Sequence, residues 1–392
     1  MAGHIRKVKL KDGHAWQVVV EKGMEANGKR QRIYRNVRGT KTEAQKVLAS
    51  LLTELDNGTY VEPDKITLSE YLRDWMQTYV EANLSPTTVD SYGINMEKHI
   101  IPHIGRILLQ ELKPMHLQKF YKVMLESGRS DGKGGLSAKS VRYIHRNIYE
   151  ALEHAVRMQM ISRNVAALVT LPKVKPYKAK VYTEDQLVVL MRAAQGTEME
   201  LLIALAVALG LRRGELLGLR WADIDFENKT LTVSNNLVQT MKGSVNKDPK
   251  SESSNRTIDL PESLIVLLKK HKKIQSENRL LLGSSYKTDG HVCCKADGSS
   301  YCPGYYSKKF KKFLKEKGLS HIRLHDLRHS NATLMLKYGV QPKVASSRLG
   351  HSSIAITLDL YSHVLSGMQK EVAEKIDMGI FQKLNSNLQG IL

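Results

Sequence analysis

R-L-H-D-L-R-H-S at residues 323–330 and R-L-G-H-S-S-I-A-I-T-L-D-L-Y-S-H at residues 348–363 organise the C-terminal half of this chain. The first segment reads as the start of a helix. Because His325 and Arg328 are three residues apart, both side chains are expected on one face of its first turn. The sequence therefore predicts a cationic helix face at this point.

The second segment adds a histidine and a tyrosine. Gly350 is placed to end a helix directly before His351, because glycine adopts the left-handed conformation that closes helices. Tyr361 comes ten residues after His351. A tyrosine approached by an arginine and two histidines suits phosphate chemistry without a metal, since guanidinium groups orient phosphate oxygens and imidazoles move protons. Tyr361 is therefore the candidate nucleophile.

These residues resemble the C-terminal signature of the tyrosine recombinases, also called phage integrases: H-D-L-R-H, then L-G-H, then a tyrosine ten residues on. A-L-G-L-R-R-G-E-L-L-G-L-R-W at residues 208–221 resembles the family's first box, which puts a catalytic arginine at Arg212. K-D-P-K-S-E-S-S-N-R-T-I-D-L at residues 247–260 resembles the hairpin with the family's catalytic lysine, here Lys250. The motifs span about residues 182–365 and fill all six catalytic positions.

The resemblance implies site-specific DNA strand exchange through a 3′-phosphotyrosyl intermediate and a Holliday junction, integrating and excising a mobile element such as a viral genome. The arginines would hold the non-bridging oxygens, the lysine would protonate the leaving oxygen, His325 would assist proton transfer from Tyr361, and His351 would support the phosphate charge. The implied catalytic residues are Arg212, Lys250, His325, Arg328, His351 and Tyr361.

The reaction conserves bond energy, so no cofactor is expected. The sequence has no nucleotide-binding G-x-x-x-x-G-K-[ST] motif and no carboxylate cluster suited to magnesium. Two other functions stay open. A type IB topoisomerase forms the same covalent link but reseals the same strand, and a DNA-binding regulator would keep the fold with a degenerate site. The basic three-part layout disfavours the first, and the retention of all six groups disfavours the second.

Positive charge extends along the whole chain of 392 residues. Lysine and arginine number 60 against 39 acidic residues, a net charge of +21. The excess is 5 over residues 1–62, 7 over residues 63–180 and 9 over residues 181–392. An excess in each part fits a long polyanion that contacts every domain, so double-stranded DNA is the expected partner.

No stretch of about 18 apolar residues occurs, and the N-terminus lacks the apolar region of a signal peptide. We expect a cytoplasmic protein, associated with the nucleoid of a bacterial host, with no membrane partner. The cysteines Cys293, Cys294 and Cys302 follow His291. Because adjacent cysteines are poorly placed to chelate one tetrahedral ion, we expect reduced, partly buried thiols and no metal.

Residues 1–62 are predicted to form a small α+β domain. β-Branched and aromatic runs at residues 15–23 and 29–37 indicate a meander of two or three strands. A helix with Thr42 as its N-cap should follow. Four arginines crowd the second run and its exit: Arg30, Arg32, Arg35 and Arg38. A solvated sheet face would explain them, but the resemblance to phage and conjugative-transposon integrases implies an arm-type DNA-binding domain.

Residues 63–170 are predicted to form an all-α bundle, with a helix starting at Ser85 and Pro86 and others near residues 114–127 and 137–159. The family places its core-binding domain here. Basic residues recur on the last helix: Lys139, Arg142, Arg146 and Arg157. Residues 171–181 contain two prolines and four lysines without an apolar periodicity, which predicts an extended basic linker lying along phosphates.

Residues 182–365 are predicted to form a mainly α catalytic domain with a small antiparallel sheet. Thr183 should cap its first helix. A second, wholly apolar helix should be buried and end at Gly210, which gives Arg212 a rigid platform of the kind that transition-state electrostatics requires. Arg212 and Glu215 are three residues apart, so an ion pair between them is also expected.

Two short strands are predicted at residues 229–233 and 256–260, with Lys250 in the polar turn between them. The nearby Lys242 and Lys247 remain alternatives for the catalytic lysine.

Residues 366–392 form the C-terminal tail. Its apolar residues are four apart: Val372, Ile376, Ile380, Leu384, Leu388 and Leu392. This spacing predicts an amphipathic helix that needs a partner. The tail could dock on its own domain, but the family resemblance favours a neighbouring protomer. It further implies a homotetramer on DNA, with an excisionase or a host DNA-bending protein as accessory partner.

Overall fold

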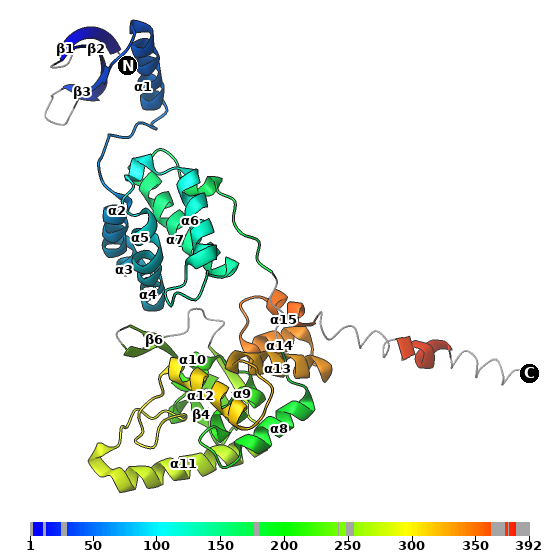
Figure 1. The fold of residues 1–392 in the computed structure, drawn as a ribbon. Coiled ribbons are helices and arrows are strands. Elements are labelled where there is room, and N and C mark those ends of the chain that lie inside the picture. The colour runs from blue at the N-terminus through cyan, green and yellow to red at the C-terminus, as the bar shows by residue number, and fades with distance from the viewer. Residues whose placement is uncertain are drawn as a thin grey trace, which may run out of the picture. The chain divides into compact units, whose positions relative to one another are not determined.

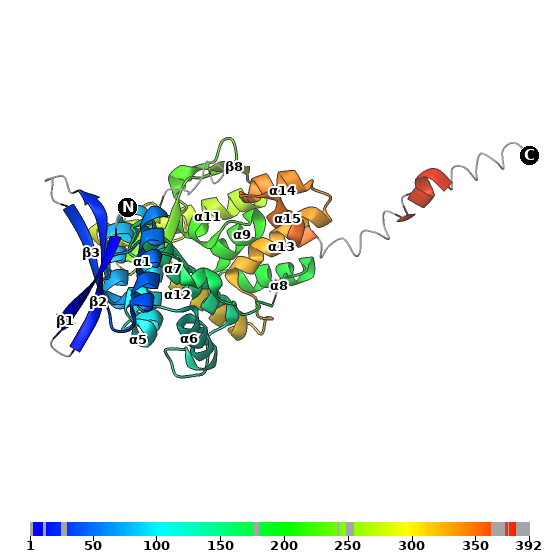
Figure 2. The ribbon, with the colours of Figure 1, turned by 90° about the horizontal axis from the view of Figure 1, so that it is seen from above.

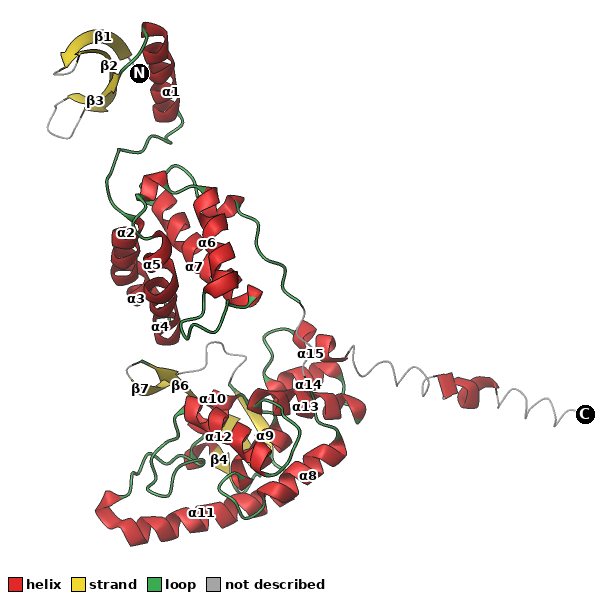
Figure 3. Cartoon of the chain, in the orientation of Figure 1, coloured by secondary structure: helices red, strands yellow, loops and turns green. Residues whose placement is uncertain are grey.

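The computed structural model describes residues 3–10, 13–24, 30–175, 180–241, 243–247, 255–361, 373–374 and 376–381. The chain divides into two compact units, Met1–Lys175 and Pro176–Leu392. Figures 1 and 3 show the helices and strands of each unit. The predicted fold class is confirmed: a three-stranded sheet with a helix comes first, a helical region follows, and the last part is mainly helical with small antiparallel sheets.

The N-terminal sheet is antiparallel, in the order β1-β2-β3. Its strands and the helix that follows are β1 (Gly3–Leu10), β2 (Gly13–Met24), β3 (Arg30–Val37) and α1 (Lys41–Asp56). Figure 2 shows α1 along one face of the sheet. Val18 and Val20 of β2 are buried there with Ala44 and Leu51 of α1. The other face carries the polar side chains of Arg6, Gln17 and Asn36 beside the buried Val19, since alternate residues of a strand point to opposite faces.

The helix start predicted at Thr42 is wrong, because Thr40 is the N-cap of α1. The Thr40 side chain accepts from the Glu43 N–H, and the Glu43 carboxylate accepts from the Thr40 N–H at 2.8 Å. This reciprocal pair needs a glutamate or glutamine three residues after the cap. Thr40 with Glu43 and Thr42 with Gln45 both have that spacing, so the pattern alone does not choose between them, and Thr42 already lies inside α1.

The helical region has its own core, centred on Trp75, Tyr71 and Leu117. Its α-helices are α2 (Leu68–Trp75), α3 (Glu81–Asn83), α4 (Pro86–Asn95), α5 (Ile101–Ile104), α6 (Pro114–Ser127) and α7 (Ala138–Arg157), joined by π-helical turns at Met76–Val80 and Met96–Ile100 and 3₁₀ turns at Leu109–Glu111 and Val165–Leu168. Ser85 is the N-cap of α4 with proline at its first position, as predicted.

The C-terminal unit surrounds the apolar helix α9. Its α-helices are α8 (Glu184–Ala194), α9 (Glu200–Leu209), α10 (Arg213–Gly218), α11 (Glu262–Leu282), α12 (Pro303–Glu316), α13 (Leu324–Lys337), α14 (Pro342–Leu349) and α15 (Ile354–Tyr361). Helices α8, α11 and α13 contact α9. The predictions for α8 and α9 are confirmed: Thr183 caps α8, and the buried α9 ends at Gly210 in a left-handed conformation.

Two small sheets complete this unit. Their strands are β4 (Ile224–Asp225), β5 (Thr230–Val233), β6 (Asn236–Thr240), β7 (Gly243–Lys247) and β8 (Arg256–Asp259). Strands β4, β5 and β8 form one antiparallel sheet, in which Val233 pairs with Arg256. The single polar turn predicted between β5 and β8 is wrong, because β6 and β7 form a separate hairpin in that interval.

The remaining segments are described only in part. Of the tail, residues 373–374 and 376–381 are described, with a π-helical turn at Asp377–Phe381 in which Ile380 is 60% exposed. No helix among the described residues is long and apolar enough to cross a membrane. The three cysteines form no disulfide, and no group of histidine, cysteine and acidic side chains among the described residues is arranged to hold a metal.

Candidate active site

Arg212 is held at the start of α10 by a carboxylate and by the end of another helix. Its backbone N–H donates to Glu215 Oε2 at 3.0 Å, and its Nη1 donates to Glu215 Oε1 at 2.6 Å. Its Nη2 donates to the carbonyl of Gly350, the residue that ends α14. Helix C-terminal carbonyls carry partial negative charge, so they suit a cation. The guanidinium is therefore oriented, while 36% of the side chain stays exposed.

Arg328 on α13 is the most deeply buried cation of the site, with 3% exposure. Its Nη1 donates to the carbonyl of Gly210 at 2.9 Å. Its Nη2 is buried too and has no hydrogen-bond partner among the described residues. A buried donor without a partner costs about 1–3 kcal/mol. An anion that accepts from this nitrogen would recover that cost.

The surroundings of Arg328 also favour an incoming anion. Burial and the neighbouring Arg212 lower the pKa of Arg328 to about 9. The guanidinium is still cationic at neutral pH, but its charge is incompletely compensated by the protein. Two arginines this close repel each other, and a phosphate between them would neutralise both.

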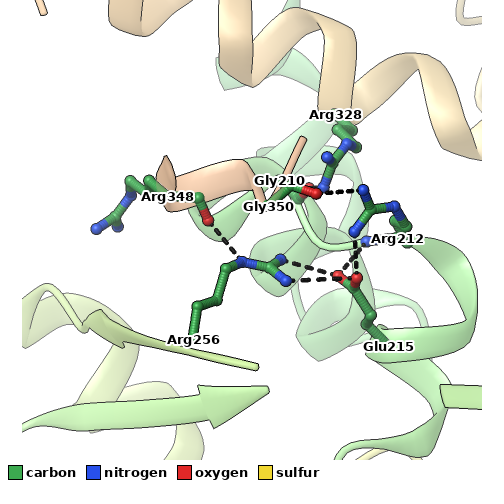
Figure 4. A network of polar contacts seen from close by, with 7 residues as sticks. All are labelled: Gly210, Arg212, Glu215, Arg256, Arg328, Arg348 and Gly350. Atoms are coloured by element: carbon green, nitrogen blue, oxygen red, sulfur yellow. Dashed lines mark hydrogen bonds and ion pairs between the residues drawn. The ribbon is translucent and has the colours of Figure 1, made fainter. Parts of the chain in front are cut away.

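Two left-handed glycines set the positions of both arginines (Figure 4). Gly210 has a φ of +61° and Gly350 a φ of +67°, a conformation that side chains with a Cβ atom disfavour. A Cβ atom on Gly210 would lie 2.7 Å from Asn331 Oδ1, and one on Gly350 would lie 2.8 Å from Arg256 Nη1. Each glycine thus closes a helix tightly enough for its carbonyl to accept an arginine.

Glu215 is the carboxylate that joins the site to the sheet. Its side chain is 6% exposed and also accepts from Arg256 at the start of β8, with Nη2 to Oε2 at 2.9 Å. Burial alone would raise the pKa of Glu215, but the hydrogen bonds and charges of Arg256 and Arg212 outweigh it and hold the pKa below its ordinary value. The predicted pair of Arg212 and Glu215 is therefore confirmed, with Arg256 as a third member.

His351 follows Gly350 directly and is partly buried. Its Nδ1 lies 2.8 Å from the hydroxyl of the buried Thr357 on α15, which fixes the ring. Burial and the charges of Arg328 and Arg212 lower its pKa to about 4. The imidazole is therefore neutral at physiological pH, and its Nε2 remains for a hydrogen bond to a ligand.

His325 and Arg328 share the first turns of α13 but not the same environment. The His325 side chain is exposed, whereas Arg328 is buried. Desolvation of the ring by the surrounding protein, and then the charges of His329 and Arg328, lower its pKa to about 4. The His329 ring lies 5.0 Å from the His325 ring, at 86° to it. Arg328 thus carries the charge predicted for this face, and His325 is a neutral group at its edge.

The structure brings Arg212, Arg328 and His351 together: hydrogen bonds join each arginine to a helix-ending glycine, and the charges of both arginines act on His351. Lys250 lies outside the described residues. Tyr361 is the last residue of α15, and its side chain is outside the described part as well. What is described is a cationic cluster with two oriented guanidinium groups and a neutral imidazole. Such a combination has the chemistry to bind a phosphate and to stabilise extra negative charge on its oxygens.

Arg256 is the member of this cluster that the sequence interpretation missed. It was assigned only to a short strand, but its side chain is 7% exposed and donates to both Glu215 and the carbonyl of Arg348. These partners are 41 and 92 residues away in sequence, so no local pattern indicates them.

Two family models match the chain. The model of the phage integrase family matches residues 180–367, and the model described as the phage integrase N-terminal SAM-like domain matches residues 67–125. Among curated proteins, a XerC-like tyrosine recombinase of Caldanaerobacter subterraneus is 28% identical over 383 residues, which cover 92% of this chain and 95% of that protein. The ICEBs1 integrase of Bacillus subtilis is 27% identical over 372 residues, which cover 94% and 98%.

Solved structures show the same fold. The Tn1549 transposon integrase in complex with a circular intermediate DNA matches with a TM-score of 0.63 and 21% identity, over 78% of this chain and 99% of that one. A lambda integrase tetramer bound to a Holliday junction matches with a TM-score of 0.55 and 19% identity, over 88% of this chain and 95% of that one.

Proposed function

We propose that the scissile phosphate binds between Arg212 and Arg328, from the premise that the chain belongs to the phage integrase family of tyrosine recombinases and is a tyrosine-type site-specific recombinase, a DNA breaking and rejoining enzyme of mobile elements. The observation that carries this proposal is the buried Nη2 of Arg328, a donor without a partner among the described residues. It lies in a cluster where burial, and then the positive charge of Arg212, lower the pKa of Arg328.

In the proposed mechanism the Tyr361 oxygen attacks the phosphorus and forms a bond to it. The phosphate stays on the 3′ end of the cut strand, as a 3′-phosphotyrosyl link. The 5′-oxygen leaves with its electron pair and takes a proton from Lys250. Arg212 and Arg328 hold the non-bridging oxygens as charge builds on them. The freed 5′-hydroxyl then attacks the phosphotyrosyl link on the partner duplex. This attack joins the two strands and releases the tyrosine of the protomer bound to that duplex.

The two histidines have different proposed parts. His351 is neutral at physiological pH, so it donates a hydrogen bond to the phosphate without adding charge. His325 is also neutral and exposed, which lets it accept the proton of Tyr361 during attack.

We propose double-stranded core-site DNA as the substrate and a homotetramer as the active assembly. Two matched structures support this: the Tn1549 integrase is bound to a circular intermediate DNA, and the lambda integrase is a tetramer on a Holliday junction. The tail beyond residue 366 would dock on the neighbouring protomer, and an excisionase or DNA-bending protein would set direction. Exposure of Ile380 in the described part of the tail fits a segment that needs a partner.

We propose that residues 1–62 bind arm-type DNA sites through the polar face of the sheet. On that face Arg6 donates to Gln17 at 2.7 Å, and Gln17 donates to Asn36 at 3.1 Å. This exposed row crosses all three strands. Side chains of these types read base edges in the major groove, which is wide enough for strands.

The test is covalent capture on a suicide core-site substrate, whose cut strand loses the nucleotides needed for religation. Wild-type protein should form a protein–DNA adduct, and Tyr361→Phe should form none while its DNA affinity stays nearly unchanged. An adduct formed by Tyr361→Phe would show that another residue is the nucleophile. A paired-site assay separates the alternatives: recombinants support this proposal, relaxation alone a topoisomerase, and binding alone a regulator.

A further inference from the structure

A third arginine, Arg256, lies inside the catalytic cluster without a place in the mechanism above. It is the first residue of β8, and its side chain is 7% exposed. Burial of an arginine is costly unless its donors are satisfied by charged or polar partners. The partners of Arg256 therefore show what its burial achieves.

One end of the Arg256 guanidinium holds Glu215. Nη2 donates to Oε2 at 2.9 Å, and Nη1 approaches Oε1 at 3.4 Å. The same two oxygens accept from the backbone N–H and the Nη1 of Arg212. Arg256 and Arg212 thus share one carboxylate, so a shift of Arg256 changes the position from which Glu215 orients Arg212 (Figure 4).

The other end of Arg256 holds the turn before His351. Its Nε donates to the carbonyl of Arg348 at 2.7 Å. Two residues later the carbonyl of Gly350 accepts from Arg212. A Cβ atom at Gly350 would lie only 2.8 Å from Arg256 Nη1, so the turn lies directly against the guanidinium.

We infer that Arg256 is a positioning residue that fixes Arg212 and the His351 turn relative to each other. One rigid, planar fork spans three elements: it starts on β8, binds Glu215 of α10 and closes the end of α14. Lysine has a single nitrogen and cannot make these bonds in one plane. This inference rests on the proposed function, because it assigns Arg256 to the orientation of groups proposed to bind the scissile phosphate.

Arg256 acts through other residues and is not itself placed to bind DNA. Its guanidinium is directed to the protein on both sides, at Glu215 and at the Arg348 carbonyl. The expected consequence is a change in the chemical step without a change in DNA affinity. A displacement of about 1 Å at a reacting group can cost about 10²-fold in rate, so the effect should be large even if the fold is intact.

The test uses the full chain and a suicide core-site duplex in single turnover, with Arg256→Lys as the main variant and Arg256→Met as the second. Three quantities are measured: the rate constant of adduct formation, its final amplitude, and the dissociation constant for the duplex. Lys229→Met is the matched control, because it removes a cation from the turn directly before β5, the strand that pairs with β8, at an exposed ion pair with Glu262.

We expect Arg256→Lys to lower the rate constant at least about tenfold, with dissociation constant and amplitude within twofold of wild type. Lys229→Met should leave all three unchanged. A role confined to folding would instead lower the amplitude and the melting temperature but leave the rate constant of the remaining active protein intact, and that result would overturn the inference. A wild-type rate constant in Arg256→Lys would also overturn it.

Arg256→Met adds a second check, since it removes the charge as well as the geometry. If it folds, its rate constant should be no higher than that of Arg256→Lys, and a higher value would contradict positioning by the fork. Failure of the proposed function itself would be visible separately, because the wild-type protein would then form no adduct that depends on Tyr361.

Discussion

Two carboxylates in this molecule each lie between two arginines, and they differ in burial. Glu215 lies between Arg212 and Arg256 and is 6% exposed. Glu21, on the N-terminal sheet, accepts from Arg32 at 3.1 Å and lies 3.5 Å from Arg30, and its side chain is 35% exposed.

The difference shows how one residue combination serves two purposes. Around Glu215, water is excluded and the guanidinium groups are held by helix ends as well as by the carboxylate. Such pairs are strongly oriented, and removal of one member is costly. Around Glu21 the arginines remain hydrated, so their pairing is weak and adjustable. The first arrangement suits a transition state, and the second suits exchange of a carboxylate for DNA phosphates.

The largest expected effect on DNA cleavage is at Arg328. It is a deeply buried cation beside the Glu215 cluster, and the arginines around Glu21 include no residue like it. Arg328→Met should lower the rate constant of adduct formation by about 10²-fold or more, the usual scale for loss of a preorganised donor at a transition state. Stability should change less than activity, because burial and Arg212 already disfavour the charge of Arg328. Single-turnover capture and thermal unfolding measure the two quantities.

Arg192→Met is the control for this prediction. Arg192 is an exposed arginine on α8 in the same unit, so its loss removes the same charge without touching the cluster. Near-normal cleavage by Arg328→Met would mean that the phosphate is held by another arginine.

The second expected effect is at Glu215. Glu215→Gln keeps the shape but leaves Arg212 and Arg256 without their shared negative charge. Loss of one partner from a buried pair costs about 3–5 kcal/mol, so the melting temperature should fall clearly, and cleavage should fall about tenfold or more as Arg212 loses its orientation. Calorimetry and single-turnover capture test this. An unchanged melting temperature would show that Glu215 is not a buried ionic link.

The contrast also explains which parts could be predicted from sequence. Arg212 and Arg328 lie in segments whose local patterns, a helix-ending glycine and a helix start, are visible in the chain, and Gly210 and Gly350 behave as expected. Arg256 was not predictable, because its partners come together only when β8, α10 and α14 pack. The hairpin of β6 and β7 was missed for a related reason, since a polar stretch between two strands does not show whether it pairs with itself.

A third, smaller effect concerns pH. His351 has an ordinary pKa of 6.5 and a pKa of about 4 in the folded protein. The unfolded chain therefore binds more protons than the folded one between these values, so stability is present above pH 6.5 and is lost as the pH falls toward 4. The melting temperature should decrease over this window. In His351→Gln the decrease should be smaller, by about 2–4 °C for each kcal/mol of unfolding free energy that the variant does not lose. Equal slopes for both proteins would contradict a lowered pKa of His351.

The smallest expected effect is at the exposed carboxylate. Glu21→Gln should change stability by less than about 1 kcal/mol, as is usual for surface ion pairs. It should nevertheless tighten binding to an arm-site duplex, because Arg30 and Arg32 no longer pair with a carboxylate on the protein and are free to contact DNA phosphates. One added phosphate contact would steepen the dependence of log affinity on log salt by about 0.9.

Asp56→Asn is the control for this prediction, since it makes the same charge change at the exposed end of α1, away from the polar sheet face. If the two variants gave the same affinity and the same salt slope, Glu21 would act only through net charge, and the polar face of the sheet would lose its support as the arm-binding surface.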